Sequence, residues 1–228
     1  MTAYKPNEFE GCAGGAPAEP GLDARAACFY RRFGKRALDI ALVLAALPVL
    51  LPVIALAAFA VALDGGAPFF RQVRVGRDGR HFGMWKLRSM IPDAEAELLR
   101  CIEADAEMRA EWDRCQKLQD DPRVTRVGRV IRKYSIDELP QLWNVLKGDM
   151  SLVGPRPVLP AQLSLYAGTA YFHLRPGLTG SWQVSDRGCD RFDARAEHDT
   201  RYLRDLSLTT DLRLILATTG VVLRGTGC

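Results

Sequence analysis

The sequence is poor in the residues that build zinc sites, redox centres and hydrolytic triads. Its 228 residues include three histidines and six cysteines, and the cysteines form no C-x-x-C pair and have no histidine nearby at zinc-ligand spacing. The motif G-x-x-x-x-G-K-[ST] is absent too. These absences exclude a zinc finger, a thiol redox motif and a P-loop ATPase. No Ser/His/Asp arrangement is recognisable, so we expect the histidines at the surface.

A strong charge of one sign is also missing. Lysine and arginine number 31 against 27 aspartates and glutamates, a formal net charge of +4. This mild excess comes without a basic patch interleaved with aromatic residues, so no nucleic-acid partner is expected. Hydrophobic residues make up 48% of the chain and charged residues 25%, as in globular proteins.

One segment does stand out for its lack of charge. The 24 residues from Ile40 to Leu63 contain no charged side chain, and a straight helix of that length could cross about 30 Å of hydrocarbon. Pro48 and Pro52 lie near the middle of this run. Each removes a backbone donor and clashes with the preceding turn, so we expect a break in the membrane helix there.

The flanks of this segment indicate how it enters the membrane. Positive charge, which marks the cytoplasmic side, lies on both flanks, so one straight span would place one flank on the wrong side. A re-entrant hairpin that turns at the prolines fits better, since two full spans would need about 40 apolar residues. A single kinked transmembrane helix and a signal peptide are the alternatives. The flanking basic residues are Arg25, Arg31, Arg32, Lys35 and Arg36 before the run, and Arg71, Arg74, Arg77, Arg80, Lys86 and Arg88 after it.

The sequence predicts three regions: a disordered tail over residues 1–30, the re-entrant membrane helix over 31–64, and a cytoplasmic catalytic domain over 65–228. In the last region, the segments PFFRQVRVG and HFGMWKLRSM predict a strand hairpin. The pattern over residues 92–119 predicts a single charged amphipathic helix, and that over residues 134–146 predicts another helix. Residues 199–223 predict one or two helices, which either pack in the core or touch the bilayer. The expected fold class is α+β, mostly helical, with a small mixed α/β catalytic domain.

Asp137 and Glu138 are the strongest candidates for chemistry, although a structural role is open to them. Ser135 and Glu138 have the spacing of a capping box, which would make both acids part of a helix start. However, Arg132 lies just before the pair, and Arg156 follows in a proline-stiffened loop suited to phosphate binding. Two carboxylates near such arginines could bind Mg²⁺ together with substrate phosphates, and an aspartate can attack phosphorus. This combination indicates phosphoryl transfer.

These residues lie in segments that resemble the bacterial sugar transferases, the monotopic polyprenol-phosphate phosphoglycosyltransferases. The resemblance runs from about Phe33 to Arg224, and its most specific segment is IDELPQLWNVLKGDMSLVGPRP. Further matching segments are KRALDI, FFRQVRVGRDGRHFGMWKLRSM, DPRVTRVGRVIRKYS and RPGLTGSWQVSDR. The chain looks like the short members of the family, notably the undecaprenyl-phosphate galactose phosphotransferases that begin exopolysaccharide synthesis.

The resemblance implies a reaction at the cytoplasmic face of the inner membrane. Asp137 would attack the β-phosphorus of a UDP-sugar and release UMP, and undecaprenyl phosphate would then take the sugar phosphate. Galactose is the expected sugar, glucose is second, and an N-acetylated sugar would also suit the motifs. Mg²⁺ is the implied cofactor, the bilayer and downstream glycosyltransferases are implied partners, and a catalytically silent membrane-anchored scaffold is the alternative. The implied site residues are Asp137 and Glu138 as catalytic and metal-binding pair, and Arg132, Arg156, Lys86 and Asp199 around the substrate.

Two positions depart from the family pattern. Leu51 precedes Pro52 where the family often has serine, whose hydroxyl can bond freed backbone carbonyls at the membrane break. Pro48 is expected to share the task of breaking the helix. Asp186 stands where the family commonly has glycine before Arg187, so the loop there is expected to have its own shape.

Overall fold

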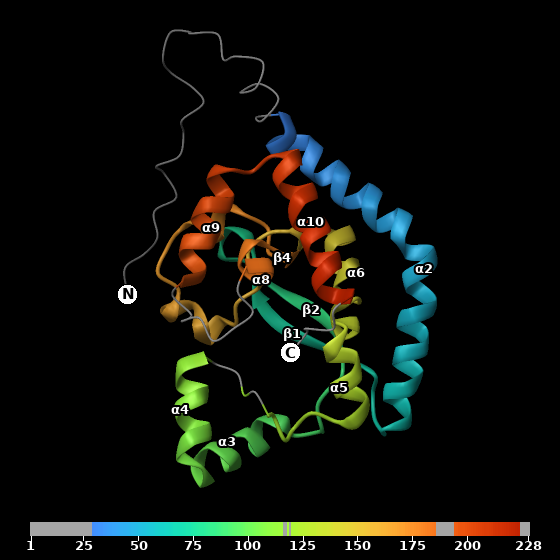
Figure 1. The fold of residues 1–228 in the computed structure, drawn as a ribbon, viewed down its shortest axis with the longest axis vertical. Helices are drawn as coiled ribbons and strands as arrows, with labels where there is room; N and C mark the ends of the chain where they lie inside the picture. Colours follow the sequence, from blue (N-terminus) through green and yellow to red (C-terminus); the bar gives the residue numbers. More distant parts are fainter. Residues whose placement is uncertain (1–28, 116–117, 119, 186–193, 224–228) are drawn as a thin grey trace.

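The computed structural model describes residues 29–115, 118, 120–185 and 194–223. The predicted disordered tail, except for its last two residues, and Asp186 with Arg187 lie outside the described residues. Within them, helices surround two small two-stranded sheets (Figure 1). The predicted α+β class, mostly helical, is confirmed. The division into a membrane region and a catalytic domain stays a prediction.

The charge-free run forms a single long helix. A π-helical turn, η1 (Tyr30–Gly34), leads into α2 (Lys35–Leu63), which contains both Pro48 and Pro52. The helix bends partway along and follows the side of the molecule (Figure 1), as expected where proline removes backbone hydrogen bonds. Among the described residues it is the one helix long and apolar enough to cross a membrane, with a mean hydropathy of 2.8 over its most apolar window.

Both halves of α2 pack against the rest of the protein. In the first half, Val43 is fully buried against Met84 and Leu142. In the second half, Val61 packs with Leu87 and Ile131. The outward side of the helix leaves large apolar side chains exposed, which a soluble protein core would have buried. These exposed residues are Leu44, Val49, Leu51, Val53, Leu56, Phe59 and Leu63.

The predicted strand hairpin is confirmed. β1 (Phe69–Val75) pairs antiparallel with β2 (His81–Leu87), with Phe70 opposite Lys86. The 3-10 turn η2 (Arg77–Gly79) joins them, and Asp78 and Gly79 adopt positive φ values of 57° and 74°. Asp and Gly tolerate this left-handed conformation best, so the turn chemistry suits the hairpin.

A second sheet lies in two segments that are rich in glycine and proline. β3 (Ser151–Val153) pairs in parallel with β4 (Gly177–Thr179). Strands of three residues among glycines and prolines show no alternation of apolar and polar side chains, so periodicity does not reveal them. Gly154 and Gly177 allow the two chains to come close, since a Cβ on Gly177 would lie 2.1 Å from the Gly154 nitrogen.

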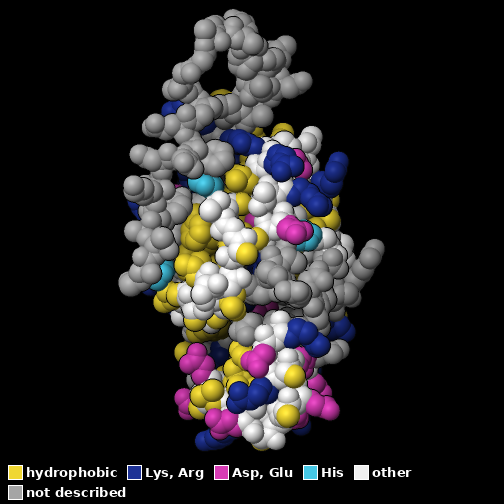
Figure 2. Space-filling model, turned by 90° about the vertical axis from the view of Figure 1, so that its left-hand side faces the viewer, with side chains coloured by type: hydrophobic (Ala, Val, Ile, Leu, Met, Phe, Trp, Pro, Cys, Tyr) yellow, Lys and Arg dark blue, Asp and Glu magenta, His cyan; other side chains and the backbone are white. Residues whose placement is uncertain are grey.

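The single helix predicted over residues 92–119 is wrong. The segment forms two helices, α3 (Ala94–Ala104) and α4 (Ala106–Cys115), separated by Asp105 in an extended conformation. The Asp105 carboxylate accepts hydrogen bonds from the backbone N–H groups of Glu107 and Met108 at 2.8 and 3.2 Å. It therefore caps a new helix, and this local bond outweighs the continuous charged pattern. Acidic and basic side chains both cover this end of the molecule (Figure 2), as predicted for a solvated face.

The capping box and the helix predicted over residues 134–146 are also wrong in part. Ser135 has a positive φ of 55° and makes no side-chain cap, and the turn that follows is the 3-10 segment η3 (Ile136–Glu138). The α-helix α6 (Gln141–Lys147) begins only after Pro140, which has no N–H to bond to the preceding turn. Before them lies an unpredicted helix, α5 (Arg126–Lys133), capped by the Thr125 hydroxyl.

The remaining elements are short except at the end of the chain. They are η4 (Pro160–Leu165), α7 (Ala170–His173), α8 (Ser181–Ser185), α9 (Ala194–Arg204) and α10 (Leu208–Leu223). The two helices α9 and α10 match the predicted helical end. Leu206 and Leu214 are buried in the core, which confirms core packing for one side of this segment. Leu208, Leu212 and Leu216 are exposed, and contact of that side with a bilayer stays a prediction.

Candidate active site

The two acidic residues singled out from the sequence lie beside a lysine from the strand hairpin. The Lys86 Nζ donates a hydrogen bond to the Glu138 Oε1 at 2.8 Å and lies 3.8 Å from the Asp137 Oδ2. Lys86 comes from β2, and the acids from η3. Ile136 packs on the Leu87 and Ile131 cluster, so the turn is held against the second half of α2. The structure therefore brings the three predicted residues together.

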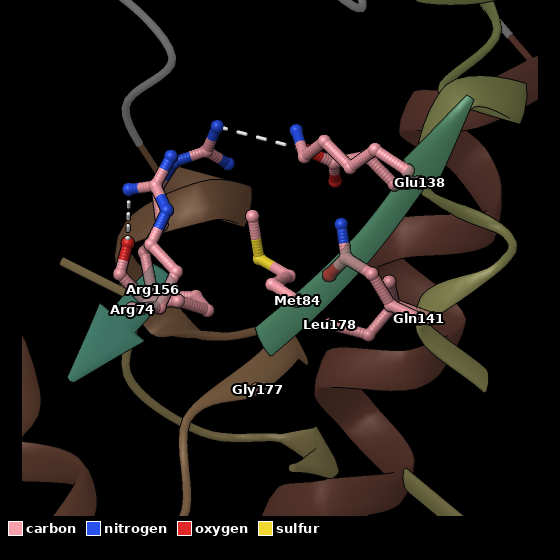
Figure 3. A pocket seen from close by; sticks show the side chains of 9 residues that line it. Arg74, Met84, Glu138, Gln141, Arg156, Gly177 and Leu178 are labelled. Atoms are coloured by element: carbon pink, nitrogen blue, oxygen red, sulfur yellow. Dashed lines mark hydrogen bonds and ion pairs between the residues drawn. The ribbon is translucent and has the colours of Figure 1, made fainter. Parts of the chain in front are cut away.

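Arginines complete the other side of the site. The Arg156 Nη2 lies 3.7 Å from the Glu138 Oε1. Arg74, from β1, donates from Nη1 to the Pro157 carbonyl at 2.9 Å and so ties the proline-rich loop to the hairpin. Together these residues line a pocket of about 250 Å³ (Figure 3), whose other walls are Met84, Lys86, Gln141, Pro157, Gly177 and Leu178.

Arg132 reaches the site from the last turn of α5. Its Nε donates to the Ser89 Oγ at 2.8 Å, just after β2. The helix and this segment are in close contact, since a Cβ on Gly128 would lie 2.0 Å from the Ser89 carbonyl oxygen. The positive charge of Arg132 favours the ionised form of Asp137. Arg132 does not line the pocket, and its charge influences Asp137 from outside it.

The two adjacent carboxyls differ in their electrostatics. Burial raises the pKa of Asp137, and Glu138 adds to this, although Lys86, Arg132 and Arg156 oppose it. Burial would also raise the pKa of Glu138, but Lys86 and Arg156 outweigh it and lower that pKa to about 2. Glu138 is therefore ionised at any ordinary pH. Neighbouring carboxyls with different environments suit different roles in catalysis.

The acidic pair fits a magnesium ion only if a substrate supplies further ligands. Within the described residues, no group of three or more Asp, Glu, His or Cys side chains could hold a metal. Mg²⁺ commonly uses one or two protein carboxylates together with substrate phosphates and water. Asp137 and Glu138 match that donor set, and an all-protein metal cage is not formed.

Asp199 is held by a different set of contacts from the acidic pair. It is buried on α9, where its Oδ2 accepts a hydrogen bond from the Tyr166 hydroxyl at 2.8 Å. Burial raises the pKa of Asp199 to about 7, although the Tyr166 hydrogen bond and Arg195 lower it. The Arg195 guanidinium lies 4.2 Å from the centre of the Trp182 ring. Asp199 does not line the pocket and belongs to this neighbouring cluster.

Sequence reasoning missed Arg74 and Gln141 as residues of the pocket. The hairpin register holds the signal for Arg74: Phe70 pairs with Lys86 and Arg74 with Phe82, and alternate residues share one face. Arg74 therefore lies on the same face as Lys86. Gln141 has no such signal, because its direction depends on where α6 starts after Pro140.

Comparison with known proteins agrees with this geometry. The family described as bacterial sugar transferase matches residues 30–225, so the chain belongs to that family, as predicted. A "UDP-galactose-lipid carrier transferase" of Erwinia amylovora is 48% identical over 86% of this chain and 42% of its own. An "undecaprenyl-phosphate galactose phosphotransferase" of Salmonella typhimurium is 43% identical, with the same coverage. The chain thus spans less than half the length of these relatives. The "exopolysaccharide production protein ExoY" of Sinorhizobium fredii is 42% identical, over 81% of this chain and 83% of its own.

Proposed function

We propose that the chain transfers a hexose 1-phosphate from a UDP-sugar to undecaprenyl phosphate, with galactose as the preferred sugar and glucose second. The observation that supports this most is the pocket lined by Glu138, Lys86 and Arg156, with Asp137 3.8 Å from the Lys86 Nζ and an exposed apolar helix nearby. The names of relatives at 43–48% identity, a "UDP-galactose-lipid carrier transferase" and an "undecaprenyl-phosphate galactose phosphotransferase", support the choice of galactose and lipid acceptor.

The chemistry takes place in two balanced steps. An Asp137 carboxylate oxygen attacks the β-phosphorus of the UDP-sugar, the bond from that phosphorus to the bridging oxygen breaks, and UMP leaves with the electron pair. A phosphate oxygen of undecaprenyl phosphate then attacks the same phosphorus and releases Asp137 as a carboxylate. The product is a diphosphate-linked sugar on the lipid.

The surrounding residues have separate tasks in these steps. Lys86 holds Glu138 in place, and its positive charge favours the ionised form of both carboxyls. Arg156 and Arg132 supply positive charge for the phosphates. Glu138, with its pKa of about 2, acts as a charged ligand and not as a proton donor. The Asp137 and Glu138 pair would hold Mg²⁺, which supplies charge neutralisation on the diphosphate when bound.

The attachment of α2 to the rest of the protein supports a site close to the lipid surface. Lys35, at the start of α2, forms a 2.8 Å ion pair with Asp211 of α10, and near its end the Val61 carbonyl accepts a hydrogen bond from Arg88 at 3.1 Å. Both ends are therefore attached to the same body, which supports a re-entrant helix with both ends on the cytoplasmic face of the inner membrane. Tags on the two termini should be accessible from that one side, and tags found on opposite sides would contradict the re-entrant placement.

UMP release tests the proposed reaction. Detergent-purified protein is given Mg²⁺, undecaprenyl phosphate and a panel of UDP-sugars, and wild type is compared with Asp137→Asn. We expect repeated turnover with one sugar to depend on the lipid, and the rate to fall about a thousandfold or more in the variant. Asp78→Asn is the matched control, because Asp78 is exposed in the hairpin turn and should leave the rate unchanged. Folded wild-type protein that releases no UMP from any sugar would favour the silent scaffold instead.

A further inference from the structure

Two residues that line the pocket each carry a buried hydrogen-bond donor with no partner among the described residues. The Nε of Arg74 and the Nε2 of Gln141 are both buried and make no hydrogen bond within the described residues. Both residues line the same pocket as Glu138 and Arg156. Gln141 is only 2% exposed. An unsatisfied buried donor is costly, so a pair of them in one pocket indicates a ligand rich in acceptor atoms.

The charge of Arg74 narrows the chemistry of that ligand. Its other two nitrogens donate to neutral groups, the Pro157 carbonyl at 2.9 Å and the Gln72 side-chain carbonyl at 2.7 Å. No described carboxylate forms an ion pair with it. Burial and the neighbouring Arg156 lower the pKa of Arg74 to about 10, which still leaves it charged at neutral pH. A partly buried cation beside another cation favours an anion over a sugar hydroxyl.

The arrangement of the pocket places the two donors around one small space. Figure 3 shows Arg74 and Arg156 on one side of the pocket, Glu138 and Gln141 on the other, and Met84 between them. The space of about 250 Å³ between the lining residues includes open solvent, so the pocket is continuous with the surface. The pocket therefore suits one charged part of a ligand, with the rest outside it.

We propose that Arg74 and Gln141 bind the phosphate next to the nucleoside, which departs in the leaving group. This rests on the proposed function, in which Asp137 with Lys86 beside it faces the other, reacting phosphorus. Negative charge grows on the departing phosphate as the bond to the reacting phosphorus breaks. A guanidinium and an amide held in place in a buried pocket stabilise that charge without reorganisation.

Binding of UDP and of inorganic pyrophosphate tests this subsite without turnover. Titration calorimetry on the full chain in detergent compares wild type with Arg74→Met, Gln141→Met and Gln141→Glu. Arg74→Met should weaken both probes about tenfold or more, because a charge-assisted bond is lost. Gln141→Glu, nearly the same shape, should weaken them more than Gln141→Met, because it adds a negative charge beside a phosphate. Arg71→Met is the matched control: it removes a positive charge from an adjacent, exposed position of β1 and should change affinity less than twofold.

The outcomes separate this subsite from the reaction itself. Wild-type binding of both probes together with the expected losses, in variants whose thermal unfolding matches wild type, supports the subsite. The proposed subsite would be overturned if the Gln141→Glu and Arg74→Met variants bound UDP and pyrophosphate as tightly as wild type. This holds even if Asp137-dependent UMP release is observed. Pyrophosphate that binds with the expected losses, in a protein that releases no UMP, would keep the anion subsite and reject the reaction. No binding of either probe by folded wild type overturns the subsite.

Discussion

Replacement of Lys86 by methionine tests the electrostatics of the site directly. The Lys86 Nζ lies 2.8 Å from the Glu138 Oε1 and 3.8 Å from the Asp137 Oδ2, and all three side chains are largely buried. Methionine keeps most of the volume and removes the charge. Two adjacent buried carboxyls then face each other without their main partner, so we expect the folded state to be destabilised.

The pKa of Glu138 provides the magnitude. Its fall from 4.5 to about 2 corresponds to about 3 kcal/mol of favourable interaction at about 1.4 kcal/mol per pKa unit, and Lys86 is the largest favourable contributor. Loss of one partner of a buried pair typically costs about 3–5 kcal/mol. We therefore expect Lys86→Met to lower the free energy of unfolding by about 3 kcal/mol at pH 7. In a chain of this length, that corresponds to a fall in Tm of about 6–12 °C.

The pH dependence has a definite sign. Since the folded pKa of Glu138 lies below its unfolded value, its ionisation stabilises the wild type fully above about pH 4.5, and this stabilisation is lost as the pH falls toward 2. Without Lys86, both carboxyls become easier to protonate in the folded state. The variant should therefore recover stability relative to wild type as the pH falls from 7 to 5.

Thermal unfolding in detergent, followed from pH 5 to 8, measures both effects. Lys147→Met is the matched control, because Lys147 makes a more exposed ion pair with Asp149 at 3.2 Å, worth about 0–1 kcal/mol. The double variant Lys86→Met with Glu138→Gln should regain part of the lost stability, since one unpaired charge is gone. A Lys86→Met protein with a Tm within about 2 °C of the control and a parallel pH curve would refute the electrostatic account.

Three further predictions concern residues around the site. Asp199→Asn should flatten the decline in Tm between pH 5 and 8, because the wild-type carboxyl, with its pKa raised to about 7, costs stability as it ionises at rising pH; parallel curves would contradict this. Asn144→Leu should lower the free energy of unfolding in urea by about 2–4 kcal/mol, because the fully buried Asn144 donates to the Gly83 carbonyl and accepts from the Trp85 N–H. An unchanged urea midpoint would argue against this role of Asn144. Gly128→Ala should lower the free energy of unfolding by more than about 1 kcal/mol despite the better helix propensity of alanine, because the new Cβ meets the Ser89 carbonyl. The rate of UMP release should fall as well, since Ser89 holds Arg132.

Local signals in the sequence led to two errors, and both have a local cause. The continuous charged pattern over residues 92–119 concealed a break, because Asp105 prefers to cap a new helix rather than continue the old one. The capping-box spacing at Ser135 and Glu138 was misleading, since Pro140 delays the α-helix and leaves the acids on a 3-10 turn. On this turn, both Asp137 and Glu138 lie close to Lys86. The capping-box pattern alone does not predict that contact.

The apolar helix α2 shows a similar division between what the sequence pattern and what the packing determine. The absence of charge from Ile40 to Leu63 and the two prolines predicted an apolar helix with a bend, because both properties depend on the residues alone. Attachment of both ends to one body depends on Lys35 meeting Asp211 and Arg88 meeting the Val61 carbonyl. Those partners are distant in sequence, so no periodicity predicts them.

Residue identity and short spacings were enough to establish the family segments, the strand hairpin and the acidic pair as a candidate for phosphoryl transfer. The tertiary structure alone decided that Arg74 and Gln141 join Glu138 and Arg156 around one pocket, and that Tyr166 is the hydrogen-bond partner of Asp199. The physical reason is that hydrophobic runs, prolines and capping side chains act within a few residues, whereas a pocket forms where hairpin register, helix starts and loop contacts meet. Each of these is set by packing between segments far apart in the chain.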